Sequence, residues 1–510
     1  MTNNCGKIFL IGAGPGDPGL ITLKAMECIK IADVVVYDYL ASPALLEYAK
    51  NDSEIIYVGK KGGDHTLSQD GINDLIINKA KQGLIVARLK GGDPFIFGRG
   101  GEEAELISDN NIDFEIIPGV TSAIAAPAYA GIPLTHREHS SSVSIITGHE
   151  DPTKQDSSIE WESFAKSNNT LVFLMGVKNL PGIVENLQKH GKDPKTPVAL
   201  VRWGTTPRQK SVTGILENIV DKVKQAGLKS PAIIIIGSVV KLREKLNWFE
   251  KKPLLGKKIV VTRARAQASN LITLLHQYGA ECIEIPTIKI NPPKDISPLI
   301  NSIDKISTFN WVIFTSVNGV KFFFDTLYSL DKDVRVLGHL KFACIGPVTK
   351  AKLKEFGIIA DVLPETYKAE SVVEAFSDKN IKGQKVLIPR AKEARPIIPE
   401  ELTKMGAIIE EVTAYETTLV DSDKDALIKL LEDNAIDIVT FTSSSTVKNF
   451  AELIPSEKFE KSIKNLTTAC IGPITEKTAQ SLGFSTDIVA TEYTIDGLVE
   501  AIVEHYNNVE

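Results

Sequence analysis

The fold of this chain is decided by two glycine-rich stretches, Gly12-Ala13-Gly14-Pro15-Gly16-Asp17-Pro18 and Gly91-Gly92-Asp93-Pro94-Phe95-Ile96-Phe97-Gly98-Arg99-Gly100-Gly101-Glu102-Glu103. Each stretch follows a short apolar run, Ile8 to Ile11 in the first case and Leu84 to Leu89 in the second. Runs of this kind predict buried parallel strands. Both loops are therefore expected at the carboxyl ends of strands, which is where open α/β sheets bind ligands.

The first loop does not have the composition of a nucleotide-binding loop. The dinucleotide pattern G-x-G-x-x-G fails at its last glycine because Asp17 stands there, and Pro15 has no N–H to donate to a phosphate. The P-loop spacing G-x-x-x-x-G-K-[ST] occurs nowhere in the chain. The sequence therefore argues against NAD and ATP, and leaves either another small-molecule site or ordinary strand-to-helix turns.

A third segment, Pro118-Gly119-Val120-Thr121-Ser122-Ala123, continues through small residues to Thr135-His136-Arg137. Thr121 and Ser122 can cap a helix of small residues that packs closely against its surroundings. With these motifs in place, residues 6 to about 245 resemble the uroporphyrinogen-III C-methyltransferases of the tetrapyrrole methylase family. The resemblance implies an α/β fold of two subdomains, about 1–118 and 119–245. It also implies methylation of uroporphyrinogen III at C2 and C7 by S-adenosylmethionine, which gives precorrin-2.

The resemblance assigns roles to individual residues of the first half. It places S-adenosylmethionine on Pro15, Gly91, Gly92, Asp93, Ile96, Thr121, Ser122, Met175 and Gly204. It makes Asp38 the proton acceptor and Lys60 the proton donor, with Lys61 standing where an arginine is more usual. Methyl transfer depends mainly on positioning, and a carboxylate at a strand end is a sensible base for a ring proton. The competing interpretation makes Asp38 a helix cap, Lys60 a surface charge and Met175 a core residue.

Composition is that of an ordinary soluble protein with room for three or four compact units. The chain has 510 residues, is 43% hydrophobic and 24% charged, and carries a net charge of −6. No apolar run approaches the roughly 20 residues of a membrane helix, and a strand begins too early for a signal peptide. The five cysteines show no C-x-x-C pair, and the eight histidines show no metal spacing. We therefore expect reduced thiols, a cytoplasmic location and no metal.

The second half begins after a linker at residues 246–256 and contains an internal repeat. Phe314-Thr315-Ser316 is echoed by Phe441-Thr442-Ser443, and Cys344-Ile345-Gly346-Pro347 is echoed by Cys470-Ile471-Gly472-Pro473. The two motifs are 30 residues apart in the first copy and 29 in the second. Such a repeat predicts two similar α/β lobes.

Basic residues gather near the expected strand ends of this half, although the whole protein is acidic. They are Arg263, Arg265, Arg390, Lys392 and Arg395. Together with the Thr-Ser and Ile-Gly-Pro motifs at helix starts, they favour an anionic small molecule over nucleic acid. Helix capping alone is the alternative for each serine and threonine.

Residues 257–510 are similar to the uroporphyrinogen-III synthases, a two-lobed α/β family. The similarity rests on the paired motifs and on Val412-Thr413-Ala414-Tyr415-Glu416-Thr417. It implies one lobe at 289–417, inserted between 257–288 and 418–510, and makes Tyr415 the residue that helps hydroxide leave hydroxymethylbilane. Its substrate-binding residues would be Arg263, Ser316, Ser443, Ser444 and Thr475. A tyrosine that only packs within a strand is the alternative for Tyr415.

The two resemblances support one another, because the product of the synthase is the substrate of the methyltransferase. We expect small-molecule tetrapyrrole substrates, no nucleic acid or membrane partner, and a homodimer formed through the methyltransferase half. Two alternatives stay open. In one, the first half methylates a different corrin-type substrate, since fold alone does not set the substrate. In the other, the second half is a non-catalytic two-lobed ligand-binding module.

Overall fold

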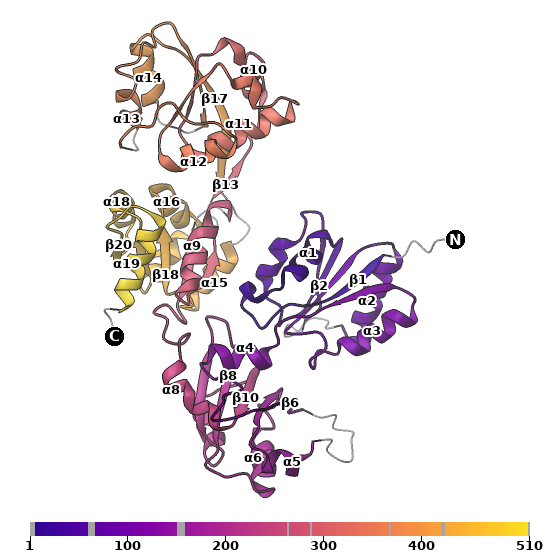
Figure 1. Cartoon of the computed structure of the whole chain (residues 1–510). Helices are drawn as coiled ribbons and strands as arrows, with labels where there is room; N and C mark the ends of the chain where they lie inside the picture. Colours follow the sequence, from indigo (N-terminus) through magenta and orange to yellow (C-terminus); the bar gives the residue numbers. More distant parts are fainter. Residues whose placement is uncertain are drawn as a thin grey trace. The chain divides into compact units, whose positions relative to one another are not determined.

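The computed structural model describes residues 6–59, 67–149, 159–262, 265–285, 288–366, 369–392, 394, 396–419 and 424–507. The chain divides into two compact units (Figure 1). Unit 1 comprises Met1–Ile259, Ile272–Cys282 and Ile502–Glu510, and unit 2 comprises Val260–Leu271 and Ile283–Ala501. Four five-stranded sheets organise them, the first two in unit 1. The expected α/β class is confirmed.

The first sheet is wholly parallel and has the order β3-β2-β4-β1-β5. Its strands are β1 (Lys7–Gly12), β2 (Val34–Tyr37), β3 (Glu54–Tyr57), β4 (Val86–Lys90) and β5 (Asp113–Ile117). Helix α1 (Leu23–Ile31) packs on one face, while α2 (Gln69–Lys81) and α3 (Gly100–Asp109) pack on the other, as Figure 1 shows. The two glycine-rich loops follow β1 and β4, which are neighbours, so they lie together at one edge.

The second sheet is mixed and has the order β6-β7-β10-β8-β9. Its strands are β6 (Val143–Thr147), β7 (Thr170–Leu174), β8 (Pro197–Arg202), β9 (Lys210–Ile215) and β10 (Ala232–Ile236). Helix α4 (Ser122–Tyr129) covers one face with alanines, which bring it close to the strands. The opposite face packs against α5 (Trp161–Lys166), α6 (Leu180–Lys189) and α7 (Ile219–Gln225).

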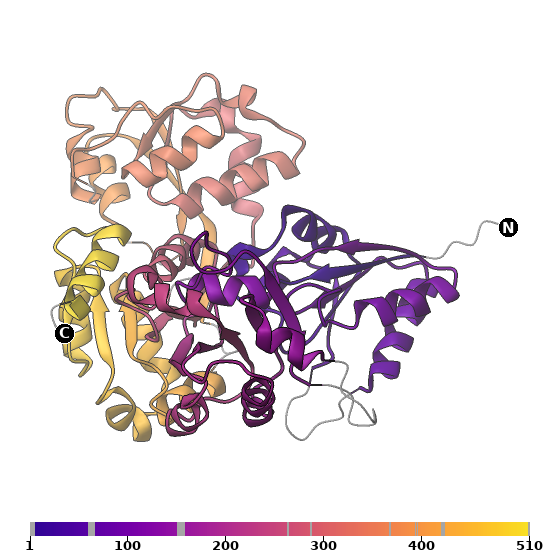
Figure 2. The same cartoon turned by 60° about the horizontal axis from the view of Figure 1, so that its bottom comes forward.

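The third and fourth sheets are each built around a strand-helix repeat. The third, β12-β11-β18-β19-β20, combines β11 (Lys258–Val261) and β12 (Glu281–Glu284) with β18 (Ile438–Phe441), β19 (Thr467–Cys470) and β20 (Ile488–Val489). In Figure 2 these strands have colours from two distant parts of the chain. The fourth, β13-β17-β16-β14-β15, consists of β13 (Ile288–Asn291), β14 (Trp311–Phe314), β15 (Lys341–Cys344), β16 (Lys385–Ala391) and β17 (Ile408–Leu419).

The sequence repeat corresponds to matching helices in these two sheets. Helices α11 (Val317–Ser329) and α12 (Pro347–Glu355) follow β14 and β15, and α16 (Ser444–Leu453) and α18 (Pro473–Ser481) follow β18 and β19. The other α-helices are α8 (Arg243–Leu246), α9 (Arg265–Gln277), α10 (Ser297–Asp304), α13 (Ala369–Glu374), α14 (Ile397–Lys404), α15 (Lys424–Glu432), α17 (Ser456–Ile463) and α19 (Ile495–Asn507). Short 3-10 helices are η1 (Pro18–Leu20), η2 (Pro43–Tyr48), η3 (Ser238–Leu242), η4 (Ile306–Thr308) and η5 (Val334–Leu337). Within the described ranges, no helix combines the length and apolarity that a membrane crossing requires.

Residues near the start of the expected linker, 246–256, pack against other residues of unit 1. The Trp248 indole donates to the carbonyl of Ala128 at 3.1 Å, and the ring of Phe249 meets that of Tyr129 at 4.9 Å. Glu250 pairs with Arg243. These residues belong to the packed surface of unit 1, because two aromatic rings and a paired carboxylate hold them there.

Candidate active sites

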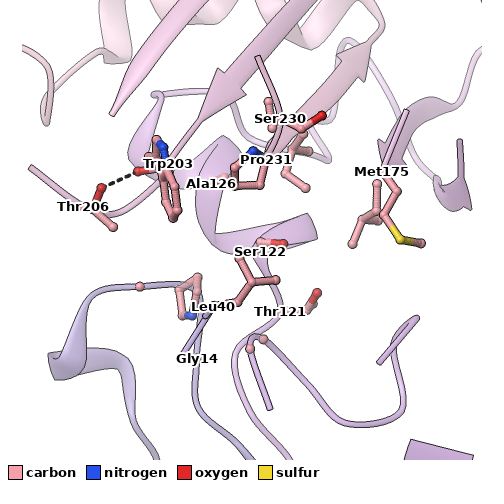
Figure 3. A pocket seen from close by; sticks show the side chains of 18 of the residues that line it. Gly14, Leu40, Thr121, Ser122, Ala126, Met175, Trp203, Thr206, Ser230 and Pro231 are labelled. Carbon is pink, nitrogen blue, oxygen red and sulfur yellow. Dashed lines mark hydrogen bonds between the residues drawn. The ribbon is translucent and has the colours of Figure 1, made fainter. Parts of the chain in front are cut away.

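Unit 1 contains a cavity of about 500 Å³ where the glycine-rich loops of the first sheet face the second sheet (Figure 3). All nine residues that the family resemblance assigned to S-adenosylmethionine line it: Pro15, Gly91, Gly92, Asp93, Ile96, Thr121, Ser122, Met175 and Gly204. In Figure 3, Gly14, Leu40 and Thr121 lie on one side, Trp203 and Pro231 on the other, and Ser122 and Ala126 of α4 between them. Residues as distant in the sequence as Pro15 and Gly204 thus share one site.

Close backbone contact explains the glycines of the first wall. The loops pair through Gly14 and Gly92, whose amides each donate to the other's carbonyl at 3.2 and 2.7 Å. A Cβ on Gly119 would lie 2.3 Å from the carbonyl oxygen of Gly92, and Gly92 itself has φ of +72°. Side chains at these positions would push the loops apart and into the cavity.

Asp93 fixes two of the loops to one another. Its Oδ1 accepts the N–H of Phe95 at 2.8 Å, and its Oδ2 accepts the N–H of Gly119 at 3.0 Å. Both carboxylate oxygens are therefore used by backbone donors, one within its own loop and one in the segment before α4. The carboxylate sets the shape of the cavity wall, which the sequence motif does not reveal.

Helix α4 and Gly204 close the cavity from the second side. The Thr121 side chain caps α4 by accepting the N–H of Ala123 at 3.3 Å. A Cβ on Gly204 would lie 2.4 Å from the Cβ of Ala126, so only glycine fits against this helix. Glycine and alanine stand where the backbone segments around the cavity come closest, and their small size keeps the cavity open. Such a cavity suits a ligand that is held largely by backbone atoms.

Backbone strain is concentrated at this cavity. Phe97, Met175 and Trp203 line it with φ of 53°, 58° and 50°, and the neighbouring Thr205 has φ of 72°. Positive φ is unfavourable for residues other than glycine, and most of all for a β-branched residue. Strain of this kind is typical of functional sites. The alternative that Met175 is a core residue is not supported, because its side chain lies in the cavity and it is 52% exposed.

Sequence reasoning missed an aromatic and cationic rim. Tyr39 meets Trp203 edge to face at 5.7 Å, and the guanidinium of Arg208 lies 4.5 Å above the Trp203 ring. Arg208 also approaches Glu281, with 3.9 Å between Nε and Oε1. Lys178 and Arg208 both line the cavity, so its rim carries positive charge. The W-G-T-T-P-R run around Gly204 is the only signal of this rim in the sequence.

Asp38 lies beside the cavity, directly before its lining residues Tyr39 and Leu40. Its Oδ1 accepts the N–H of Leu40 at 3.1 Å, and its Oδ2 accepts from Nη2 of Arg88 at 3.2 Å. Asp38 does not cap the following helix η2, whose N-cap is Ser42. Lys60 and Lys61 lie outside the described residues.

The strained loop after Trp203 is connected to the first glycine-rich loop. The Asp17 amide donates to Thr205 Oγ1 at 3.1 Å, and the Tyr129 hydroxyl donates to Asp17 Oδ2 at 2.8 Å. Burial, together with this hydrogen bond, raises the pKa of Tyr129. The Thr205 amide donates to Gln209, and Gln209 in turn donates to Glu250, both at 2.8 Å. Glu250 thus supports the loop after Trp203 through Gln209, and Thr205 of that loop contacts Asp17 of the first glycine-rich loop.

In unit 2, the two expected residues Ser316 and Tyr415 lie in contact. Their hydroxyl oxygens are 3.0 Å apart, and Ser316 also caps α11 by accepting the N–H of Gly319 at 3.0 Å. Tyr415 lies in β17, is 8% exposed and stacks on Phe322 at 5.9 Å. Packing therefore accounts for the ring, and the hydroxyl has a partner.

The remaining expected substrate residues occupy helix starts. Ser443 caps α16 in a reciprocal capping box with Thr446. Ser444 accepts the hydroxyl of Thr478 at 2.8 Å, and Thr475 is buried in the first turn of α18. Capping, the alternative considered for these residues, is thus what Ser316 and Ser443 do in this structure. Arg263 lies outside the described residues.

The expectation that the histidines form no metal-type cluster is wrong. His136, Glu138 and His139 bring one ligand atom each within 4.8 Å of one another. A turn closed by the bridge between His136 and Ser140 produces this grouping, which linear spacing does not show. Nδ1 of His136 accepts the N–H of Glu138 at 3.2 Å, so this ring nitrogen is already engaged.

The architecture defines the class of protein: a two-sheet methylase-type unit joined to a two-sheet α/β unit with an internal repeat. A family model for tetrapyrrole (corrin/porphyrin) methylases matches residues 7–220, and one for uroporphyrinogen-III synthase HemD matches residues 269–500. The chain belongs to both families, as a fusion of a tetrapyrrole methylase with a uroporphyrinogen-III synthase.

Two relatives in sequence agree with this assignment. A porphyrin biosynthesis protein HemD from Ruminiclostridium josui is 39% identical over 499 residues, which cover 98% of each chain. A uroporphyrinogen-III C-methyltransferase from Priestia megaterium is 56% identical over 235 residues, 46% of this chain and 98% of that protein. A solved uroporphyrin-III C-methyltransferase from Thermus thermophilus, complexed with S-adenyl homocysteine, is 38% identical and covers 46% of this chain and 100% of its own, with a TM-score of 0.40.

Proposed function

We propose that this chain is a bifunctional enzyme that closes hydroxymethylbilane to uroporphyrinogen III and methylates this product at C2 and C7 to precorrin-2, which feeds sirohaem or cobalamin synthesis. The observation that carries the proposal is the cavity of unit 1, which gathers all nine residues assigned to S-adenosylmethionine. Membership of the second half in the synthase family supplies the preceding step.

S-adenosylmethionine, when bound, supplies a methyl group on an electrophilic sulfonium. We assign its binding to the two glycine-rich loops, the start of α4, Met175 and Gly204. Their backbones approach closely without side chains between them, so they can hold a ligand rigidly by its polar atoms. Rigid positioning is what a methyl transfer between held partners needs most.

Each methylation forms one carbon–carbon bond, breaks one carbon–sulfur bond and releases one proton from the tetrapyrrole. We assign the acceptance of this proton to Asp38, whose carboxylate stands at the end of β2 beside the cavity. Lys60 is the proposed proton donor. The positive rim formed by Arg208 and Lys178 suits a substrate that carries many carboxylates.

For the second half, ring closure of hydroxymethylbilane expels its hydroxyl group, which leaves as water. We assign assistance of this departure to Tyr415, and carboxylate binding to Arg263, Ser316, Ser443, Ser444 and Thr475. Half-buried Ser316 and buried Tyr415 share a hydrogen bond, so the proposed acid is supported by a second hydroxyl.

Incubation of the purified chain with hydroxymethylbilane tests both activities. Without S-adenosylmethionine we expect uroporphyrinogen III, and with it precorrin-2, identified by isomer-resolved chromatography and mass. Production of the type I isomer alone would make the second half a non-catalytic module. Uroporphyrinogen III that stays unmethylated would assign the first half to a different corrin substrate. We also propose a homodimer through unit 1, to be tested by light scattering.

A further inference from the structure

Three charged residues are buried together beneath the first sheet. Arg88 and Lys90 alternate along β4 and point to the same face, where Glu103 of α3 meets them. They are 3%, 4% and 0% exposed, respectively. Nζ of Lys90 lies 2.6 Å from Oε1 of Glu103, and Nε of Arg88 lies 3.8 Å from the same oxygen. Gln69 of α2 donates to that oxygen at 2.9 Å.

Stability alone does not account for this cluster. Removing charges from water is costly, and buried ion pairs are often no more stable than apolar residues of similar size. Burial also lowers the pKa of Lys90, so its ammonium is disfavoured there. Oε2 of Glu103 and Nε of Arg88 are buried without a hydrogen-bond partner among the described residues. A cluster built mainly for stability would satisfy these atoms.

The cluster ends at Asp38. Arg88 directs Nη1 to the carbonyl of Leu89 at 2.8 Å and Nη2 to Oδ2 of Asp38 at 3.2 Å. The side chain of Arg88 is 4% exposed, whereas that of Asp38 is 27% exposed. A chain of charges thus runs from Lys90 through Glu103 and Arg88 to the carboxylate beside the cavity. Asp38 is the member of this chain that reaches solvent and, by its position, substrate.

We propose that Glu103 is a positioning residue for Asp38: its carboxylate attracts the guanidinium of Arg88 across the 3.8 Å ion pair, and Arg88 in turn hydrogen-bonds the carboxylate that accepts the substrate proton. The inference rests on the proposed role of Asp38. A base fixed by a buried guanidinium on one oxygen and by the Leu40 amide on the other keeps one orientation. Fixing that orientation before the reaction lowers the barrier, and a misplacement of about 1 Å costs roughly 10²-fold in rate.

The test is Glu103→Gln, with Glu105→Gln as a matched control. Both residues lie on α3, but Glu105 is exposed and lies outside the second glycine-rich stretch. We expect Glu103→Gln to lower the kcat of methylation by roughly 10²-fold. The KM values for both substrates and the affinity for S-adenosylmethionine stay unchanged. Glu105→Gln leaves all of these unchanged. Normal methylation in Glu103→Gln would overturn the inference.

A second variant separates positioning from folding, because Glu103→Gln leaves an uncompensated buried cation. The double variant Lys90→Met, Glu103→Gln removes one charge of each sign and retains the pair of Arg88 with Asp38. We expect it to fold, to keep full synthase activity and S-adenosylmethionine affinity, and still to methylate slowly. Recovery of normal kcat in the double variant would show that Glu103 only balances charge, and would overturn the inference.

A double-mutant cycle with Asp38→Asn separates the positioning role of Glu103 from the proposed role of Asp38 as proton acceptor. If Glu103 acts through Asp38, adding Glu103→Gln to Asp38→Asn lowers the residual turnover no further. A full additional loss contradicts positioning. An active Asp38→Asn enzyme would instead remove the proposed role of Asp38, and the inference with it. An inactive Asp38→Asn enzyme beside an active Glu103→Gln enzyme would leave that role intact and reject the inference alone.

Discussion

The hydroxyl of Tyr415 lies 3.0 Å from that of Ser316, although 99 residues separate them in the chain. Ser316 comes from the start of α11 and Tyr415 from the middle of β17. The hydrogen bond therefore joins one copy of the sequence repeat to the long strand that follows it. It also fixes the direction of the Tyr415 hydroxyl, so the two residues are best tested as a pair.

Replacing Tyr415 with phenylalanine removes the hydroxyl and keeps the stacked ring. We expect synthase turnover to fall by roughly 10²-fold, as for loss of a general acid, with methylation of supplied uroporphyrinogen III unchanged. Formation of uroporphyrinogen III measures this. Tyr328→Phe, at a tyrosine that is 44% exposed in the same sheet's helix layer, is the control. A Tyr415→Phe enzyme with full turnover and only lower stability would make Tyr415 a packing residue.

Asp38→Asn keeps the size of the side chain and removes its basicity. We expect turnover of methylation to fall by roughly 10²–10⁴-fold, because the proton acceptor is lost. Affinity for S-adenosylmethionine, measured by calorimetry, should be retained, since Asp38 does not line the cavity. Asp52→Asn, at an exposed residue, is the matched control. A fully active variant would return Asp38 to a structural role.

The two neighbouring lysines are compared by Lys60→Met and Lys61→Met. If Lys60 donates a proton to the reaction, methylation turnover falls by roughly 10²-fold in the Lys60 variant. The Lys61 variant keeps its methylation turnover. The rate of methylation at saturating substrates is the measurement. Equal behaviour of the two variants would contradict a specific role for Lys60.

Asp93→Ala leaves the amides of Phe95 and Gly119 without their shared acceptor. Two hydrogen bonds to a carboxylate contribute roughly 1.5–3 kcal/mol each, so the loops of the cavity wall should loosen. We expect S-adenosylmethionine affinity to fall by at least about 10-fold, with synthase turnover retained. Asp109→Ala, at an exposed position on α3, is the control. Loss of both activities would indicate global unfolding rather than a local effect.

The cysteines give a prediction about pH. Burial raises the pKa of Cys344 and of Cys470 to about 12, from an ordinary value of 9.0. At about pH 8 the native thiols should resist alkylation, unlike half-buried Cys282, and should react after unfolding. The unfolded state releases thiol protons first, so the free energy of unfolding should fall as the pH rises from 9.0 towards 12. Rapid native alkylation of both thiols would contradict this.

The sequence predicted the parts of the fold that local pattern determines. Apolar runs before glycine loops placed β1 and β4, and the repeated Phe-Thr-Ser and Ile-Gly-Pro motifs placed the matching strands and helices of unit 2. The residues that the resemblance assigned to S-adenosylmethionine all line the cavity of unit 1, and their role in binding it stays a prediction. In contrast, the rim of Tyr39, Trp203 and Arg208 depends on the packing of two sheets, and the run from Trp203 to Arg208 does not by itself indicate the contact with Tyr39.

Two features escaped the sequence analysis for the same reason. The turn that groups His136 with His139, and the packing of Trp248 and Phe249 on unit 1, both depend on tertiary contacts. The spacing of these residues in the sequence indicates neither the turn nor the packing. The charged cluster at Glu103 is a similar case: within its motif this residue looks like any other acidic residue at the start of a helix, and only its burial sets it apart.

The contacts of Glu250 bear on where the chain can be divided into two separate enzymes. A methyltransferase cut after Leu246 would lack Trp248, Phe249 and Glu250, and with them the support of Gln209, which binds the Thr205 amide. The loop that carries Gly204 would then lose one of its hydrogen-bonded supports, although every residue of the cavity would still be present. A division after Glu250 keeps these contacts within the methyltransferase half, so part of the segment between the two enzymes contributes to the structure of the first.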